Sequence, residues 1–306
     1  MRIGYLGPAG TFTEMALMRL PEAETAESVP YPSVDAALAA VRAGEIDSAV
    51  VAMENSVEGG VSATLDALAT GEPLHIVGEV LVPIRFVLAV RPGTRMEDIT
   101  GVSTHSHAWA QVRGWMATHR PEATFVPALS NAAAAADLGG SAPMPFQAAV
   151  CPQIAADRHG LVPLADDIGD IPDAVTRFVV AARPGHLPEP TGADKTTLVI
   201  FQRDDRPGGL LGLLEQFAAR GINLTRLESR PTKSSLGSYY FSIDLEGHVA
   251  DERVGETLMG LRRICSEVRF IGSYPRADRR PAEIHPDHDD DAYIDARSWL
   301  EGLRLA

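Results

Sequence analysis

The sequence has 306 residues, of which 45% are hydrophobic and 22% are charged. These fractions are ordinary for globular proteins, and the length suits about two domains of roughly 100–200 residues each, which excludes a chain disordered throughout. The 27 Lys and Arg residues against 41 Asp and Glu residues leave a net charge of −14 at pH 7. Nucleic acids and anionic membranes bind positive surfaces, so neither is expected as a partner, although a local site can still bind an anionic small molecule.

Short apolar runs alternate with Ala- and Leu-rich stretches before residue 184. The strand-like runs are Ile3–Leu6, Ala49–Met53, Phe86–Val90 and Phe178–Ala182. The helix-like stretches, with apolar residues at i, i+3 and i+4, are Ser33–Ala43, Val61–Thr70, Ala108–His119 and Ala132–Leu138. This alternation predicts an α/β domain with mostly parallel strands.

Residues 184–195 contain three prolines and two glycines without apolar periodicity, which predicts a linker. Beyond it we expect strands at Thr197–Arg203, Ile222–Glu228, Tyr239–Leu245 and Val268–Tyr274, and helices at Gly209–Arg220 and Glu252–Cys265. The resulting order βαββαβ is that of a ferredoxin-like domain. The tail from Pro275 is polar, so we expect disorder over 285–291 and a short helix over Tyr293–Arg304.

The two cysteines, Cys151 and Cys265, lie far apart in the sequence, which favours free buried thiols over a disulfide. No run approaches the roughly 18–20 apolar residues of a membrane span, and the first apolar run is too short for a secretory leader. We therefore expect a cytoplasmic protein.

Sequence motifs for cofactors are missing: there is no Walker A loop, no G-x-G-x-x-G after the first strand and no H-E-x-x-H. The run His285–Asp291 lacks a fixed ligand spacing and is interpreted as solvated charge rather than a metal site. We expect neither metal nor another cofactor, so the chemistry must come from side chains and backbone dipoles.

Three loops, Gly7–Thr13, Glu54–Gly60 and Ser103–Ser106, each place small residues and hydroxyls between a predicted strand and a helix. The free N–H groups and the dipole of a helix N-terminus both favour an anion, and such loops gather at the carboxyl ends of strands. The diffuse negative surface charge is screened beyond about 8 Å, so it does not prevent an anion from binding at these loops. The loops predict an anion site, the alternative being that each is only a helix cap.

Five motifs then occur in one order along residues 4–231. They are Gly7-Pro8-Ala9-Gly10-Thr11-Phe12-Thr13-Glu14, Glu54-Asn55-Ser56-Val57-Glu58-Gly59, Thr176-Arg177-Phe178, Gly208-Gly209-Leu210-Leu211 and Glu228-Ser229-Arg230-Pro231. Together they resemble those of the monofunctional prephenate dehydratases with a C-terminal ACT regulatory domain. Three places depart from the family pattern: Thr104-His105-Ser106-His107 replaces Ser-His-Pro-Gln, Ala174 replaces an Asn, and Gly209 replaces an Ala.

The resemblance implies an α/β catalytic domain over residues 2–183, with two lobes like those of a type 2 periplasmic binding protein. The chain would cross between the lobes near 80–83 and 164–168. A linker over 184–195, a ferredoxin-like βαββαβ ACT domain over 196–274 and the partly disordered tail over 275–306 would follow.

The implied reaction converts prephenate to phenylpyruvate, water and carbon dioxide. By resemblance, Thr176 would donate a hydrogen bond or a proton to the leaving hydroxyl group. Thr11, Asn55, Ser56, Thr104 and Arg177 would hold the carboxylates, while Phe178 would either line the ring or be an ordinary core aromatic. For His105, a solvated loop position and a role in proton transfer both stay open.

The ACT resemblance implies L-phenylalanine as an allosteric effector, bound across a subunit interface, and a homodimer or homotetramer formed through the ACT and catalytic domains. The effector residues implied are Gly208, Gly209, Leu210, Leu211, Asn223, Leu224, Glu228 and Ser229.

Two other functions are open to this sequence. An arogenate dehydratase differs only by an amino group on the substrate's side chain. A non-catalytic amino-acid sensor would also combine a binding-protein-like domain with an ACT domain, but the Thr176-Arg177-Phe178 motif argues against it.

Overall fold

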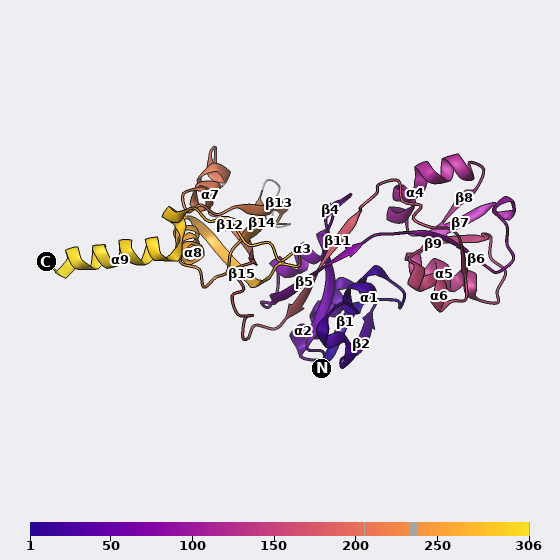
Figure 1. Cartoon of the computed structure of the whole chain (residues 1–306), viewed down its shortest axis with the longest axis horizontal. Coiled ribbons are helices and arrows are strands. Elements are labelled where there is room, and N and C mark those ends of the chain that lie inside the picture. The colour runs from indigo at the N-terminus through magenta and orange to yellow at the C-terminus, as the bar shows by residue number, and fades with distance from the viewer. Residues whose placement is uncertain (205, 233–237, 306) are drawn as a thin grey trace. The chain divides into compact units, whose positions relative to one another are not determined.

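The computed structural model describes residues 1–204, 206–232 and 238–305 (Figure 1). The chain forms two compact units, each described here by itself. Unit 1 contains residues 1–64 and 80–178, and unit 2 contains residues 65–79 and 179–306.

The first sheet has the strand order β2-β1-β3-β11-β5, with the short β4 paired to β3. Its strands are β1 (Arg2–Leu6), β2 (Glu27–Tyr31), β3 (Ser48–Asn55), β4 (Gly59–Gly60), β5 (His75–Pro83) and β11 (Val175–Ala182). The helices in this part of the chain are α1 (Phe12–Leu17), the 3-10 helix η1 (Pro21–Glu24), α2 (Val34–Ala43) and α3 (Ser62–Ala69). The strands β5 and β11 each begin in one unit and end in the other.

Local sequence explains the first long helix, α2. The Ser33 hydroxyl accepts a hydrogen bond from the Ala36 N–H at 3.1 Å and so caps its N-terminus. Gly44 ends the helix in the left-handed region, at φ 76°, which suits a residue without a Cβ. Between these caps, Ala37, Leu38 and Val41 form the fully buried face.

The second sheet lies entirely within unit 1 and has the order β10-β6-β9-β7-β8. Its strands are β6 (Val87–Val90), β7 (Gly101–Thr104), β8 (Thr124–Pro127), β9 (Ala148–Cys151) and β10 (Val162–Ala165). The 3-10 helix η2 (Met96–Asp98) and the helices α4 (Ser106–His119), α5 (Asn131–Gly139) and α6 (Gln153–Arg158) connect them. We call residues 1–64 with the first half of β11 lobe 1, and residues 87–165 lobe 2.

The strands of lobe 2 are not mostly parallel, which corrects the expectation from the sequence. β7 pairs in parallel with β8 and β9, but β6 pairs antiparallel with both β9 and β10. A parallel pair requires a long crossover. Such a crossover, through α4, joins β7 to β8, whereas β6 enters from the other sheet through residues 84–86 and is not joined directly to β9 or β10.

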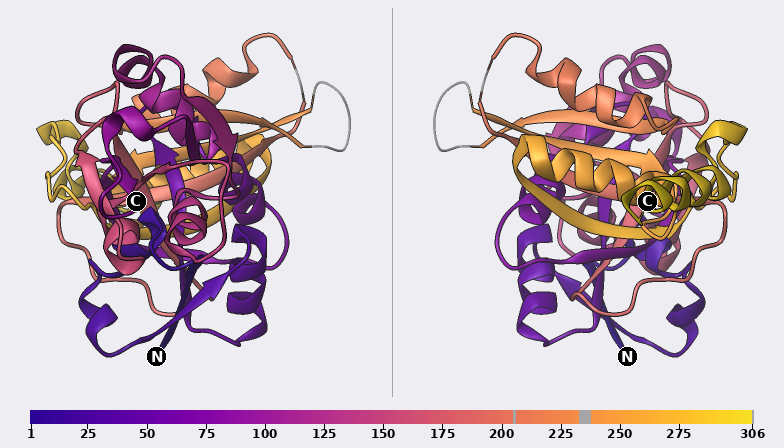
Figure 2. Two further views of the ribbon diagram at one scale, coloured as in Figure 1. Left: turned by 90° about the vertical axis from the view of Figure 1, so that its right-hand side faces the viewer. Right: turned by 90° about the vertical axis from the view of Figure 1, so that its left-hand side faces the viewer.

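Unit 2 contains the expected βαββαβ domain, in which every pairing of the sheet β13-β14-β12-β15 is antiparallel. Its elements are β12 (Asp194–Gln202), α7 (Gly209–Ala218), β13 (Leu224–Pro231), β14 (Tyr239–Glu246), α8 (Glu252–Ile264) and β15 (Cys265–Pro275). Both helices lie on one face of this sheet (Figure 2). Leu213, Phe217 and Leu261 of the helices belong to one buried core cluster with Ile200 and Ile243 of the strands. The ferredoxin-like order is confirmed.

The tail differs from its expectation. Residues 285–291, expected to be disordered, include the 3-10 helix η3 (Pro286–His288), and α9 (Asp290–Leu305) begins three residues before the expected helix. Polar contacts hold these residues: Asp289 accepts a hydrogen bond from the Ala292 N–H at 2.9 Å, and Asp290 accepts one from the Glu252 N–H at 2.9 Å. Both predicted free cysteines are confirmed as free and buried. Within the described ranges, no helix is long and apolar enough to cross a membrane.

A buried ion pair ties β13 to β14 in unit 2. The Arg226 guanidinium donates to both Asp244 carboxylate oxygens, at 2.9 and 3.2 Å, and the Thr197 hydroxyl donates to Asp244 at 2.7 Å. Asp244 is fully buried. Removing one partner of such a pair leaves an uncompensated buried charge.

Asp244→Asn is therefore expected to lower the free energy of unfolding by about 3–5 kcal/mol. Urea unfolding of the full chain, followed by circular dichroism, measures this loss. The control is Glu97→Gln, which removes an exposed ion pair with Arg95 and should leave the midpoint unchanged. Equal midpoints for the two variants would contradict the role given to Asp244.

Candidate active site and effector site

A cavity of about 290 Å³ lies between the two lobes of unit 1. All three predicted anion loops contribute to its lining: Thr11, Phe12 and Thr13 from the first, Asn55 and Glu58 from the second, and His105, His107 and Ala108 from the third and the start of α4. The structure thus brings the three loops together at one place. The volume of this cavity is near the lower end of the range of roughly 300–1,000 Å³ that is typical of small-molecule sites.

Sequence reasoning missed a fourth loop. Leu129, Ser130, Asn131 and Ala132 also line the cavity, together with Pro152. The Ser130 hydroxyl caps α5 by accepting a hydrogen bond from the Ala133 N–H at 2.9 Å. A serine just before an alanine-rich run is a helix-start signal, so this loop could have been found from the sequence.

Thr176 and Asn55 meet in the cavity although they are 121 positions apart. The Asn55 side-chain amide donates a hydrogen bond to the Thr176 hydroxyl oxygen at 2.8 Å. Backbone N–H groups of Val57 and Glu58 donate to the Asn55 carbonyl oxygen at 2.8 and 3.1 Å, which fixes the orientation of this amide. Because the Thr176 oxygen accepts from Asn55, its own proton is free to point elsewhere.

The alternation of strand β11 separates the members of the Thr-Arg-Phe motif. Thr176 and Phe178 both line the cavity, whereas Arg177, between them, does not. Successive side chains of a strand point to opposite faces. Arg177 is buried and lies 3.6 Å from the Glu54 carboxylate.

Two further predicted residues have other partners and do not line the cavity. The Ser56 hydroxyl accepts a hydrogen bond from the Val175 N–H at 2.9 Å, and the Ser56 N–H donates to the Val175 carbonyl at 2.9 Å. Thr104 is fully buried, and its hydroxyl lies 2.7 Å from the Val150 carbonyl and 3.0 Å from the Asn131 side-chain oxygen. Their contacts join neighbouring elements within the lobes.

One wall of the cavity carries two histidines. His105 is half-buried, and burial first, then the neighbouring His107, lower its pKa, while Glu58 opposes this shift. Its Nδ1 accepts a hydrogen bond from the His107 N–H at 3.3 Å. A neutral His105 therefore carries its proton on Nε2 and can donate a hydrogen bond into the cavity.

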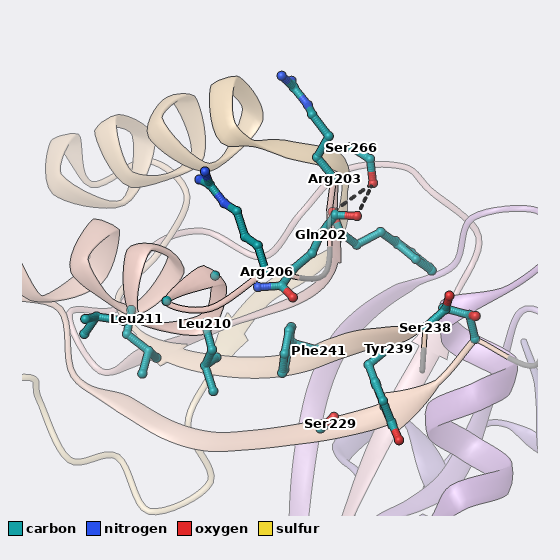
Figure 3. Close-up of a pocket in the computed structure, with 15 residues that line it drawn as sticks. Gln202, Arg203, Arg206, Leu210, Leu211, Ser229, Ser238, Tyr239, Phe241 and Ser266 are labelled. Atoms are coloured by element: carbon teal, nitrogen blue, oxygen red, sulfur yellow. Dashed lines mark hydrogen bonds between the residues drawn. The ribbon is translucent and has the colours of Figure 1, made fainter. Parts of the chain in front are cut away.

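A second cavity, of about 740 Å³, lies in unit 2 at the start of α7 (Figure 3). Five of the predicted effector residues line it: Gly208, Gly209, Leu210, Leu211 and Ser229. Gly208 has φ 79°, in the region that favours glycine, and so allows the turn into α7. The glycine-rich turn and the strand β13 therefore meet at one site.

The lining also includes residues that sequence reasoning did not name. Arg203, Arg206, Tyr239 and Phe241 also line this cavity. The side chains of Arg203 and Arg206 extend away from Leu210 and Ser229 (Figure 3). The described lining residues include two arginines and no acidic side chain, which suits a carboxylate. The leucines and aromatic rings suit an apolar side chain.

Three predicted effector residues lie away from this cavity in the single chain. Asn223 is exposed before β13, Leu224 packs against the core, and the Glu228 carboxylate lies 3.7 Å from the Arg226 guanidinium. None of them lines the cavity. Within a single chain, this cavity is therefore lined by only some of the predicted effector residues.

A two-lobed α/β domain with an interlobe cavity, followed by a ferredoxin-like domain with its own cavity, defines a catalytic or binding domain joined to a regulatory domain. The family model described as prephenate dehydratase matches residues 3–186, and the one described as ACT domain matches residues 196–263. The chain belongs to the prephenate dehydratase family.

Three proteins with known names or structures are similar to this chain. A prephenate dehydratase from Mycolicibacterium vanbaalenii is 46% identical over 99% of this chain and 98% of its own length. The crystal structure of a prephenate dehydratase from Arthrobacter aurescens in complex with L-Phe is 53% identical, covers both chains completely and has a TM-score of 0.95. A structure described as GqqA, a quorum quenching acylase, is 30% identical over 92% of this chain and 100% of its own, with a TM-score of 0.80.

Proposed function

We propose that the protein converts prephenate to phenylpyruvate, water and carbon dioxide, and that L-phenylalanine inhibits it through the ACT domain. Family membership and the named relatives support this activity. The observation that carries it is the Thr176 hydroxyl in the interlobe cavity, oriented by Asn55 at 2.8 Å.

In the reaction, the bond between the ring and its carboxylate breaks, and the electron pair of this bond forms a new ring double bond. The adjoining ring double bond shifts one position toward the opposite ring carbon, and the bond between that carbon and its hydroxyl group breaks. The departing oxygen takes a proton that comes from solvent, and it leaves as water. Thr176 donates the hydrogen bond that stabilises this oxygen. Because a threonine hydroxyl has a high intrinsic pKa, it acts as a donor or relay rather than as a free acid.

The substrate's two carboxylates need hydrogen-bond donors. Among the described residues that line the cavity there is no Arg or Lys, so Arg177 does not hold a carboxylate directly from its place in this structure. The Thr11 hydroxyl donates its proton to the Leu6 carbonyl at 3.0 Å, so it is not free for a carboxylate. The donors we assign instead are the backbone N–H groups at the starts of α1 and α5 and the His105 Nε2 proton. Phe178 and Phe12 provide apolar surface for the ring.

The effector proposal rests on the cavity of unit 2. Its arginines suit the carboxylate of L-phenylalanine, and its leucines suit the ring. The relative from Arthrobacter aurescens was crystallised with this amino acid, which supports the assignment. Asn223, Leu224 and Glu228 would contribute from a second subunit, so we infer a homodimer or homotetramer.

We also retain the proposed domain limits, 2–183, 184–195, 196–274 and 275–306. The family matches over 3–186 and 196–263 support them. The ends of β5 at Pro83 and β10 at Ala165 support interlobe crossings near 80–83 and 164–168. We place the enzyme in the cytoplasm.

The experiment that tests the activity incubates the purified chain with prephenate, and separately with arogenate, in excess EDTA. We expect phenylpyruvate from prephenate at the same rate with and without the chelator, because the described residues contain no group of metal-ligating side chains. A matched sample with added magnesium or zinc is the control. Turnover that EDTA abolishes and metal restores would contradict the cofactor-free reaction, and no product from either substrate would support the sensor.

A further inference from the structure

Glu58 stands out in the interlobe cavity because it is the one acidic side chain among the described residues that line it. The proposed substrate carries two carboxylates, which a nearby anion repels. The partners of Glu58 therefore decide whether its charge is available to a ligand.

Both carboxylate oxygens of Glu58 have a side-chain partner on α4. His107 Nδ1 lies 2.8 Å from Oε2, and the Gln111 amide donates to Oε1 at 3.0 Å. His107 and Gln111 are four residues apart on the helix, so both face the same way. We call these three residues the Glu58 clamp; it joins the second loop of lobe 1 to α4 of lobe 2.

The clamp has opposite consequences for two related substrates. Prephenate carries a keto oxygen, which accepts hydrogen bonds, where arogenate carries an ammonium group, which donates them and is positively charged. A free carboxylate would bind the ammonium group, but in the clamp each Glu58 oxygen already has one partner on α4, which holds the carboxylate toward that helix. His105, whose ring centroid is 4.9 Å from that of His107, adds the Nε2 donor to the same wall. This wall suits a keto oxygen and disfavours a cation.

We infer that the Glu58 clamp is a specificity determinant, which makes the site select the keto acid over the corresponding amino acid by withholding Glu58 from the ammonium group. This inference rests on the proposed dehydratase function. In this inference, His107 and Gln111 contribute to substrate selection by holding the Glu58 carboxylate.

The test measures kcat/KM for prephenate and for arogenate and compares their ratio among variants. In His107→Leu/Gln111→Leu, Glu58 is released, so we expect kcat/KM for arogenate to rise and the ratio to fall by roughly 10- to 100-fold, as for one hydrogen bond to a charged group. Adding Glu58→Gln to this double variant removes the carboxylate and should abolish the gain. The control, His119→Leu, replaces an exposed histidine of α4 outside the cavity and should keep the wild-type ratio.

The possible outcomes distinguish a failure of the inference about the Glu58 clamp from a failure of the proposed dehydratase function. If the wild type turns over prephenate and the folded double variant keeps its ratio, the clamp is not the determinant. A gain that persists after Glu58→Gln also overturns it, while failure of the wild type on both substrates overturns the dehydratase function itself. Should the double variant not fold, His107→Leu alone is measured, since this side chain is 69% exposed; an unchanged ratio there counts against the clamp.

Discussion

Thr176→Ala is expected to lower kcat by roughly 10²–10⁴-fold, the usual range for loss of a positioned proton donor. The hydroxyl is the group that Asn55 orients, at 2.8 Å, in a cavity where nothing else of the Thr-Arg-Phe motif offers a donor. Thr176→Ser keeps the oxygen and should retain much more activity. Stopped assays with prephenate, on variants whose folding is checked by circular dichroism, measure the effect.

The control for this variant is Ser106→Ala, which removes an exposed hydroxyl at the last residue of the third loop, outside the cavity lining. It should keep the wild-type rate. A folded Thr176→Ala enzyme that works within a few-fold of wild type would remove Thr176 from the reaction.

L-Phenylalanine is expected to lower the affinity for prephenate by about 5–150-fold, the usual range of allosteric coupling, and prephenate must weaken L-phenylalanine binding by the same factor. Arg206→Gln removes a guanidinium from the unit 2 cavity and should weaken L-phenylalanine binding roughly 10- to 100-fold. Uninhibited turnover should stay near wild type. Calorimetry gives the binding constants, and initial rates with and without L-phenylalanine give the inhibition.

Asn223→Ala separates a site within one chain from a site shared by two. Asn223 does not line the cavity of its own chain, so its loss abolishes inhibition only if it reaches a partner's cavity. Co-refolded mixtures of the Arg206→Gln and Asn223→Ala chains should then regain part of the inhibition, because some interfaces receive both intact residues. Unchanged inhibition in both variants would contradict the effector site.

The regular elements were largely predictable because their signals are local. The βαββαβ order followed from the apolar periodicity of its predicted strands and helices. The strands β2, β8 and β10 were not predicted because they are short and partly exposed, so they lack a long apolar run. The longer β5 and the short, fully buried β9 were not predicted either. Their place is decided by pairing with distant strands, which local propensity does not encode.

The site was predicted in part for the same reason. Two loop motifs pointed to Thr11 and Asn55, and the family resemblance implied Thr176; all three line one cavity. The opposite orientation of Arg177 follows from strand alternation, but only once β11 is known to begin at Val175 rather than Phe178. The partners of Glu58 lie about 50 residues away on another lobe, so no spacing rule could identify them.

The most direct test of the account measures both products of one reaction in the presence of a chelator. The purified chain is given prephenate in EDTA, while phenylpyruvate is followed by absorbance and carbon dioxide is trapped and counted. We predict one carbon dioxide for each phenylpyruvate, at a rate that depends on the Thr176 hydroxyl. Bound prephenate that yields neither product would contradict the account.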